Sequence, residues 1–98
     1  MAYTINDTIN LTTYDGLNAR KILDVNVHEI LHISLEKNTI FPKHTSPTDA
    51  SLLVLEGTIS FFIDDLEYEL TKHQIFNFPK DKVHWVEATE NSKFLLLR

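Results

Sequence analysis

Cysteine is absent from this 98-residue chain, and glycine and proline occur only two and three times. Without cysteine the chain can form neither disulfides nor thiolate metal sites, and cysteine spacing gives no indication of the redox compartment. Two glycines are too few for a glycine-rich loop around a phosphate, and no Gly-x-Ser-x-Gly nucleophile motif is present. These absences argue against nucleotide binding and against covalent catalysis.

Basic charge and long apolar runs are also scarce. The formal net charge is −5 and the only arginines are Arg20 and Arg98, so no basic stripe is available for a phosphate backbone and we expect no nucleic-acid partner. No segment approaches the roughly 18 consecutive apolar residues of a membrane span, and residues 1–6 lack the pattern of a secretory signal. We therefore expect a cytoplasmic protein without a membrane partner.

The length and composition fit one compact domain, residues 1–98. Hydrophobic residues make up 43% and charged residues 23% of the chain, which is typical of soluble globular proteins and unlike disordered chains. A chain of this length supplies one apolar core but not two.

Apolar and polar residues alternate with a period of two, and no long stretch shows the three-to-four spacing of a helix. Turn residues stand at Asp15-Gly16, Lys37-Asn38 and Asp64-Asp65, and a polar loop spans residues 43–49. Short strands at fairly even spacing, with no helix between them, predict an all-β jelly roll or another small barrel. The predicted strands are residues 4–12, 19–24, 27–35, 51–55, 58–63, 66–70, 75–78, 84–88 and 94–97.

Residues 44–57 contain part of a known motif, which runs His, any residue, His, three or four residues, Glu, six residues, Gly. Starting at His44, the frame puts Ser46 at the second His and Ala50 at the Glu, and Gly57 matches the closing Gly. The stretch that begins at His44, with Pro47 and Ala50 before Leu-Leu-Val-Leu-Glu-Gly, is also similar to a variant found in small single-domain proteins that have lost two metal ligands.

A second motif runs Gly, five residues, Pro, any residue, Gly, two residues, His, three residues, Asn, and it fits from position 73. Pro79 and His84 match it, whereas His73, Asp81 and Ala88 replace the two glycines and the asparagine. Asp81 is a plausible substitute because Asp tolerates positive φ. Together the two motifs resemble those of cupins, and the resemblance covers about the last two thirds of the chain.

The resemblance implies a cupin double-stranded β-helix, which is a jelly-roll barrel. In a complete cupin site three imidazoles and one carboxylate hold a divalent transition metal. Here the resemblance leaves His44 and His84 as metal ligands, while Ser46 and Ala50 cannot replace a nitrogen and a carboxylate. Two nitrogens hold a divalent ion far less well than four ligands, so we expect either a weakly bound divalent metal of unknown identity or no cofactor.

Other histidines and one carboxylate leave alternatives open. His32 could supply a third nitrogen if its side of the strand faces inward, and Asp49 could supply a carboxylate. With no motif to pair them, His28, His32 and His73 are predicted as ordinary surface or strand residues. His44 and His84 could equally be polar residues of the barrel mouth that hydrogen-bond to each other, to water or to the backbone.

These candidates support two hypotheses of function. The first is a small cupin of unknown specific role that binds a small molecule, and weakly a metal ion, in the barrel mouth. The alternative is a metal-dependent enzyme, a dioxygenase or isomerase of small organic acids or sugars, that uses His44 and His84. We predict an apolar pocket with a polar rim, lined by Ser46, Ala50, Leu52, Val54 and Phe61.

Two apolar residues, Leu53 and Phe62, alternate onto the strand faces opposite the predicted barrel interior. In a monomer both side chains would be exposed to water. A two-fold dimer that packs sheet against sheet would bury them, and the resemblance to small cupins also implies a homodimer. We therefore expect a small-molecule ligand and a second copy of the chain as partners.

Overall fold

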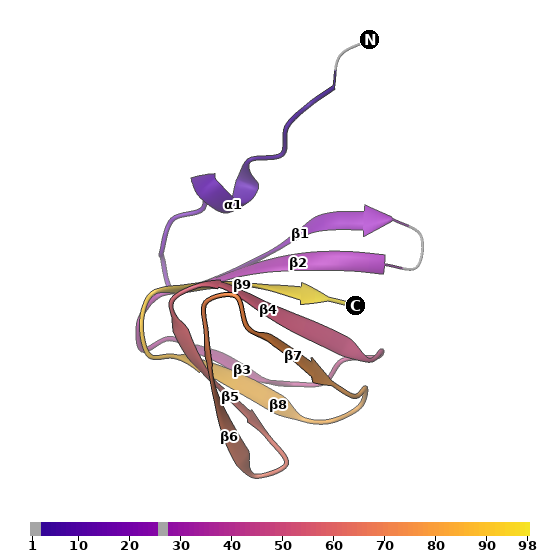
Figure 1. Cartoon of the computed structure of the whole chain (residues 1–98), viewed down its shortest axis with the longest axis vertical. Helices are drawn as coiled ribbons and strands as arrows, with labels where there is room; N and C mark the ends of the chain where they lie inside the picture. The colour runs from indigo at the N-terminus through magenta and orange to yellow at the C-terminus, as the bar shows by residue number, and fades with distance from the viewer. Residues whose placement is uncertain (1–2, 26–27) are drawn as a thin grey trace.

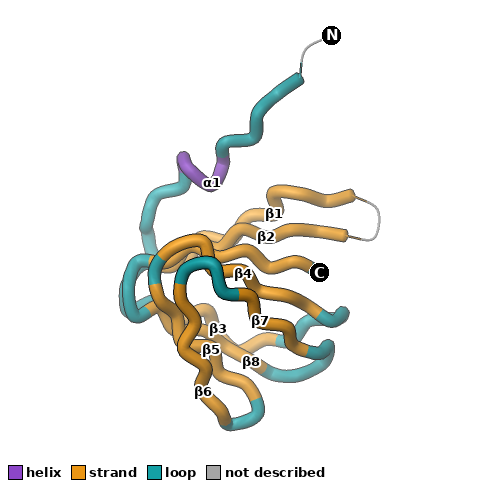
Figure 2. The backbone as a smooth tube through the Cα atoms, in the orientation of Figure 1, coloured by secondary structure: helices purple, strands orange, loops and turns teal. Residues whose placement is uncertain are grey.

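The computed structural model describes residues 3–25 and 28–98. These residues form two stacked antiparallel sheets, preceded by one short helix (Figures 1 and 2). The five-stranded sheet has the order β1-β2-β9-β4-β7, and the four-stranded sheet has the order β3-β8-β5-β6. The elements are α1 (Thr8–Leu11), β1 (Leu17–Val25), β2 (His28–Leu35), β3 (Ile40–His44), β4 (Ala50–Glu56), β5 (Thr58–Ile63), β6 (Leu66–Thr71), β7 (Ile75–Phe78), β8 (His84–Ala88) and β9 (Ser92–Leu97).

This architecture confirms the all-β jelly-roll prediction. The strands β8 and β9 come late in the chain yet lie inside the sheets, with β9 between β2 and β4 and β8 between β3 and β5. Strands that are distant in the sequence therefore pair with one another within each sheet, as in a jelly roll. Among the described helices, none has the length and apolar character needed to cross a membrane.

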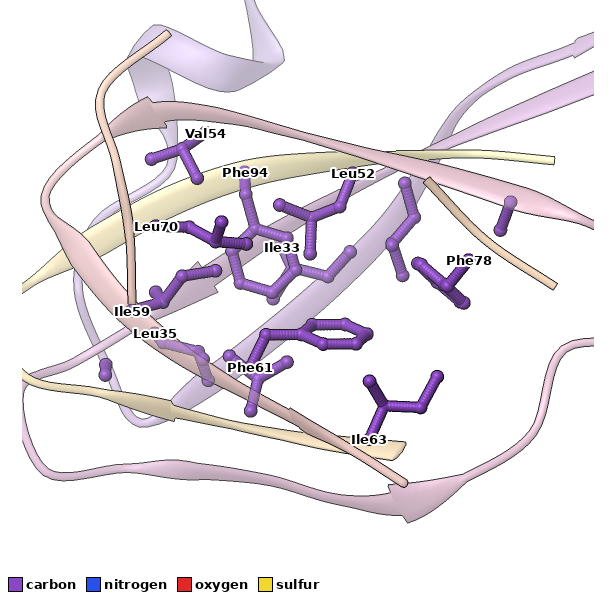
Figure 3. Packing of buried hydrophobic residues seen from close by; sticks show 14 residues of the cluster. Ile33, Leu35, Leu52, Val54, Ile59, Phe61, Ile63, Leu70, Phe78 and Phe94 are labelled. Atoms are coloured by element: carbon purple, nitrogen blue, oxygen red, sulfur yellow. The ribbon is translucent and has the colours of Figure 1, made fainter. Parts of the chain in front are cut away.

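The core lies between the two sheets because inward and outward side chains alternate along each strand. Leu52 and Val54 of β4 are fully buried, whereas Leu53 between them is half-buried. Phe61 of β5 points into the same interior (Figure 3). The buried cluster comprises Ile33, Leu35, Ala50, Leu52, Val54, Ile59, Phe61, Ile63, Leu70, Phe78, Val86, Ala88, Phe94 and Leu96.

The structure shows that the strand predicted for residues 4–12 is wrong. This segment leaves the barrel and contains only the single turn α1 (Figure 1). The Asn6 side-chain oxygen accepts hydrogen bonds from the amide and the hydroxyl of Thr8, and such local bonds compete with strand pairing. Tyr3 and Ile5 are each 93% exposed, so the apolar alternation here faces no core.

Residues 3–16, which we call the N-terminal arm, are tied to the barrel by Lys93 of β9 and by hydrogen bonds from Ser34 to Thr13 and between Glu36 and Gly16. The Lys93 side chain is buried, and its ammonium group donates a 2.8 Å hydrogen bond to the Ile9 carbonyl. The same group lies 3.8 Å from the Glu56 carboxylate and 5.3 Å from the centre of the Tyr14 ring. Burial and the neighbouring Glu56 carboxylate raise the pKa of Tyr14 to about 12. The arm thus covers one end of the outward face of the five-stranded sheet.

Strand β3 was not predicted, because its residues had been assigned to a bend and to the start of the polar loop. Proline has no amide proton for a sheet and is confined to edge strands, and Pro42 lies in β3, which pairs with β8 at the edge of the four-stranded sheet. His44 therefore ends a strand. In the predicted strand 27–35, residue 27 lies outside the described residues, and β2 begins at His28.

The predicted turns have the backbone that their residues favour. Asn38, Asp64 and Asp65 have φ values of 70°, 52° and 61°, in the left-handed region that Asn and Asp tolerate better than other non-glycine residues. His73 and Asp81, which replace the glycines of the second motif, have φ values of 70° and 65°. The motif therefore keeps its turn geometry although the glycines are gone.

Candidate functional site: an imidazole pair inside the barrel

The structure brings His44 and His84 together, although forty positions separate them in the sequence. His44 ends β3 and His84 begins β8, and the two residues are Cα partners in the antiparallel pairing of these strands. Their Nε2 atoms are 2.9 Å apart, and the ring centroids are 4.2 Å apart with an edge-to-face tilt of 68°. We call these two residues the imidazole pair.

Backbone carbonyls fix the orientation of both rings. His44 Nδ1 lies 2.7 Å from the Pro42 carbonyl oxygen, and His84 Nδ1 lies 2.9 Å from the Lys82 carbonyl oxygen. A carbonyl oxygen only accepts hydrogen bonds, so each Nδ1 must carry the proton and donate it. The two Nε2 atoms that face each other are then both proton-free in the neutral rings, and a 2.9 Å contact between them requires one additional proton.

Aromatic rings surround the pair. The Phe41 ring stacks on His44 with centroids 4.5 Å apart, and Phe61 and Phe78 lie 5.3 Å and 4.6 Å from the His84 ring. His84 is 2% exposed, whereas His44 is half-buried. Burial lowers the pKa of His84, and the nearby His44 lowers it further, although the bond to the Lys82 carbonyl raises it. Burial therefore disfavours an added proton on His84.

The other motif positions provide no metal ligand. The Ser46 hydroxyl donates to the Thr48 carbonyl at 2.7 Å, and Ala50 has no donor atom. The Asp49 carboxylate accepts the Lys80 amide at 3.0 Å and lies on the exposed loop. The described residues contain no group of three or more His, Asp or Glu side chains able to hold a metal ion.

The geometry of the pair gives a second test of fit for a metal. Two nitrogens bound to one tetrahedral zinc ion at about 2.0–2.1 Å lie roughly 3.3 Å apart, which is more than the 2.9 Å between the Nε2 atoms. Stable sites also supply at least three protein ligands. The donor set therefore does not fit a resident metal ion held by the protein alone.

The residues predicted to line a pocket occupy different places. Leu52, Val54 and Phe61 are fully buried in the packed core, and Ser46 is 3% exposed. Ala50 borders a shallow surface cavity of about 440 Å³ that is lined by residues 49–51 and 77–79. Phe78 lines this cavity, and its ring also packs against the ring of His84.

His32 was predicted as an ordinary surface or strand residue, and it lies in strand β2. It is fully buried, and it alternates with the core residues Ile33 and Leu35, so its side chain lies on the outward face of the five-stranded sheet. It therefore cannot supply a third nitrogen inside the barrel. Neither ring nitrogen has a hydrogen-bond partner among the described residues, and burial, followed by the nearby Lys93 charge, lowers the pKa of His32.

Two stacked antiparallel sheets, with two motif imidazoles in contact between strands β3 and β8, define a cupin-like barrel. The family described as "Cupin domain" matches residues 31–97, and the chain belongs to this family. The match begins in β2 and ends in β9, so the N-terminal arm and β1 lie outside it.

Solved structures agree with this assignment. A conserved protein of unknown function from Streptococcus pyogenes is 26% identical, with a TM-score of 0.82 over 99% of this chain and 86% of that one. A cupin-2 domain containing protein from Shewanella frigidimarina is 25% identical, with a TM-score of 0.79 over 96% and 92% of the two chains. An RmlC-like cupin from Desulfovibrio desulfuricans shares the fold at 17% identity, with a TM-score of 0.85 over 98% and 95%. A search of curated proteins gave no match.

Proposed function

We propose that this cupin binds a small organic acid in the barrel mouth and uses the imidazole pair as its polar anchor. The observation that carries the proposal is the 2.9 Å contact between two Nε2 atoms whose rings both donate Nδ1–H to carbonyls. One additional proton makes this contact a hydrogen bond and gives the pair a single positive charge.

The ring of His44 is the more exposed of the two and stacks on Phe41. A carboxylate neutralises an imidazolium in a site of low polarity, where such charge-assisted bonds are strong. The aromatic side chains around the pair suit a ligand that combines one carboxylate with an apolar body.

The chemistry of the described site favours binding over catalysis. No carboxylate among the described residues hydrogen-bonds to either imidazole, so neither ring has the oriented acid–base partner of a catalytic dyad. The metal-dependent alternative would need the substrate or water to complete the coordination of an ion that has only two protein nitrogens.

The test is a thermal-shift and calorimetry panel at pH 6.5. Small aliphatic and aromatic carboxylates are compared with their neutral amides on the wild type, on His44→Ala and on His28→Ala, which changes an exposed histidine at the start of β2. A carboxylate at ten times its Kd should stabilise the wild type and His28→Ala by about 1.4 kcal/mol, which raises Tm by roughly 6 °C. The amides should have no effect, and His44→Ala should not respond.

Three results would contradict the proposal. The first is a panel in which no carboxylate raises Tm, and the second is an equal response to acid and amide. The third is stoichiometric binding of zinc, nickel or manganese that disappears in both His44→Ala and His84→Ala, because this result would support the metal-dependent alternative.

A further inference from the structure

A small cavity of about 180 Å³ lies between the N-terminal arm and the edge strand β1. Arg20 lines it and is the Cα partner of His32, so both side chains lie on the outward face of the five-stranded sheet, on the side of α1 (Figure 1). Sites for drug-sized ligands measure roughly 300–1,000 Å³, so this cavity suits a smaller ligand. Its lining residues are Thr8, Leu11, Thr12, Thr13, Asn18 and Arg20.

Arg20 is the only charged residue among these lining residues, and no carboxylate in the described part of the chain pairs with it. Arg98, the other arginine, pairs with Glu29. Within the described residues the Arg20 side chain makes one hydrogen bond, from Nε to the Asn18 side-chain oxygen at 3.4 Å, which is longer than the usual range. A guanidinium has five N–H donors, so Arg20 keeps donors for the oxygens of a ligand.

The arm forms the roof of this cavity, and specific hydrogen bonds hold the arm in place. The buried Lys93 ammonium donates to the Ile9 carbonyl at 2.8 Å. The amide and the hydroxyl of Thr12, which is 8% exposed, both donate to the Thr8 carbonyl, at 3.0 Å and 2.7 Å. Because the roof is ordered before a ligand arrives, binding costs less conformational entropy.

His32 lies beside Arg20 and is fully buried, with no hydrogen-bond partner for either ring nitrogen among the described residues. Burial lowers its pKa most, the charges of Lys93 and Arg20 lower it further, and the Glu56 carboxylate raises it. Tyr14 of the arm lies against Lys93 and is uncharged near neutral pH, because its pKa is about 12. An anion on Arg20 would offset one of the two positive charges, so His32 would accept a proton more readily.

We propose that this cavity binds a small oxyanion, either inorganic sulfate or phosphate or the phosphate group of a small molecule, with Arg20 as its anchor. An oxyanion supplies the acceptor oxygens that a guanidinium needs, and such charge-assisted hydrogen bonds are strong. The threonine and asparagine side chains of the lining are uncharged, so they do not repel an anion. The site is separate from the imidazole pair, which lies between β3 and β8 of the other sheet.

The experiment is isothermal titration calorimetry with sodium sulfate at constant, low ionic strength, because salt screens exposed charges. Sulfate is the first probe, since a phosphate group titrates at about pH 6. The wild type and His44→Ala should bind sulfate equally well, whereas Arg20→Gln should bind it about tenfold or more weakly. Lys72→Gln is the matched control, because it removes the same charge from the exposed turn after β6 and should keep the wild-type affinity.

Two further measurements locate the bound ion. Sulfate should slow hydrogen exchange of the Leu11 and Thr12 amides, which donate to carbonyls within the arm. Sulfate affinity should also rise as the pH falls from about 7.5 to about 5.5 in the wild type and less so in His32→Leu, because the occupied cavity favours the proton on His32. Tighter binding of phenyl phosphate than of inorganic phosphate would indicate a phosphate group as the ligand, and weaker binding would indicate the free ion.

Circular dichroism verifies that each variant is folded. A wild type that binds no sulfate at about 10 mM would overturn the proposal, as would equal weakening by Arg20→Gln and Lys72→Gln. Binding that disappears in His44→Ala but persists in Arg20→Gln would also overturn it, because the anion would then bind at the imidazole pair. A pH dependence that is the same in His32→Leu would contradict the role of His32.

Discussion

Gly57 and Gly16 offer a matched test of what the closing glycine of the first motif does. Both have positive φ, +85° for Gly57 and +60° for Gly16, so alanine meets backbone strain at either position. At Gly16 a Cβ atom would meet open space, whereas at Gly57 it would overlap the Asn91 carbonyl and the Ser92 backbone and hydroxyl. The substitution is the same in both cases, and only the surroundings differ.

The expected magnitudes follow from these two contributions. Left-handed backbone costs a non-glycine residue roughly 1–2 kcal/mol, and the loss of glycine's freedom in the unfolded chain offsets about 0.4–1 kcal/mol of that. Gly16→Ala should therefore lower the free energy of unfolding by about 1.6 kcal/mol or less. The overlap at Gly57 adds the roughly 1–3 kcal/mol typical of overpacking, so Gly57→Ala should lose about 1–3 kcal/mol more than Gly16→Ala.

Urea unfolding followed by the fluorescence of Trp85, the single tryptophan, measures both free energies. Trp85 stacks on Phe62 between strands β5 and β8, so its emission should change when the barrel opens. Equal losses in the two variants would refute the reasoning, because the close approach of β9 to Gly57 would then contribute nothing.

Two further predictions concern the N-terminal arm and the buried histidine outside the barrel. Lys93→Met keeps an apolar side chain of similar length but removes the hydrogen bond to Ile9 and the ion pair to Glu56. Amide hydrogen exchange should therefore become faster across residues 8–12. Unchanged protection of these amides would show that Lys93 does not hold the arm. His32→Leu should raise the free energy of unfolding at pH 7.5 by about 1–2 kcal/mol, because two buried nitrogens without partners are removed. Burial holds the pKa of His32 below its unfolded value of about 6.5, so the unfolded chain takes up the proton first and wild-type stability should fall as the pH drops below about 6.5. The pH dependence of urea unfolding should be weaker in His32→Leu, and an unchanged slope would contradict this assignment.

Local sequence predicted much of the barrel because strand pattern and turn chemistry act over a few residues. Alternation identified the inward residues of β4 and β5, and Asp64-Asp65 identified the hairpin turn between β5 and β6. His73 and Asp81 show the same principle, since residues tolerant of positive φ occupy the places of two motif glycines. The resemblance to the cupin motifs also singled out His44 and His84, which the fold brings into contact.

The failures occurred where a residue's surroundings come from distant parts of the chain. The alternation of residues 4–12 resembles that of a strand, yet none of the described strands pairs with them, and Asn6 and Thr8 hydrogen-bond to each other instead. His32 was predicted as an ordinary surface or strand residue, and β2 contains it, but its side chain is fully buried on the outward face of the sheet. The pattern in β2 alone cannot indicate this burial.

The sequence by itself determined that the chain forms short strands, where most of them turn, and which side chains alternate inward, because these properties depend on neighbouring residues. Only the tertiary structure decided that Pro42 and Lys82 orient the two imidazoles through their carbonyls, and that Lys93 binds the arm 84 positions away in the sequence. It also decided that the outward face of the five-stranded sheet exposes Leu23, Ile75 and Leu97. These outcomes depend on contacts between segments that are distant in the sequence, and strand periodicity carries no information about such contacts.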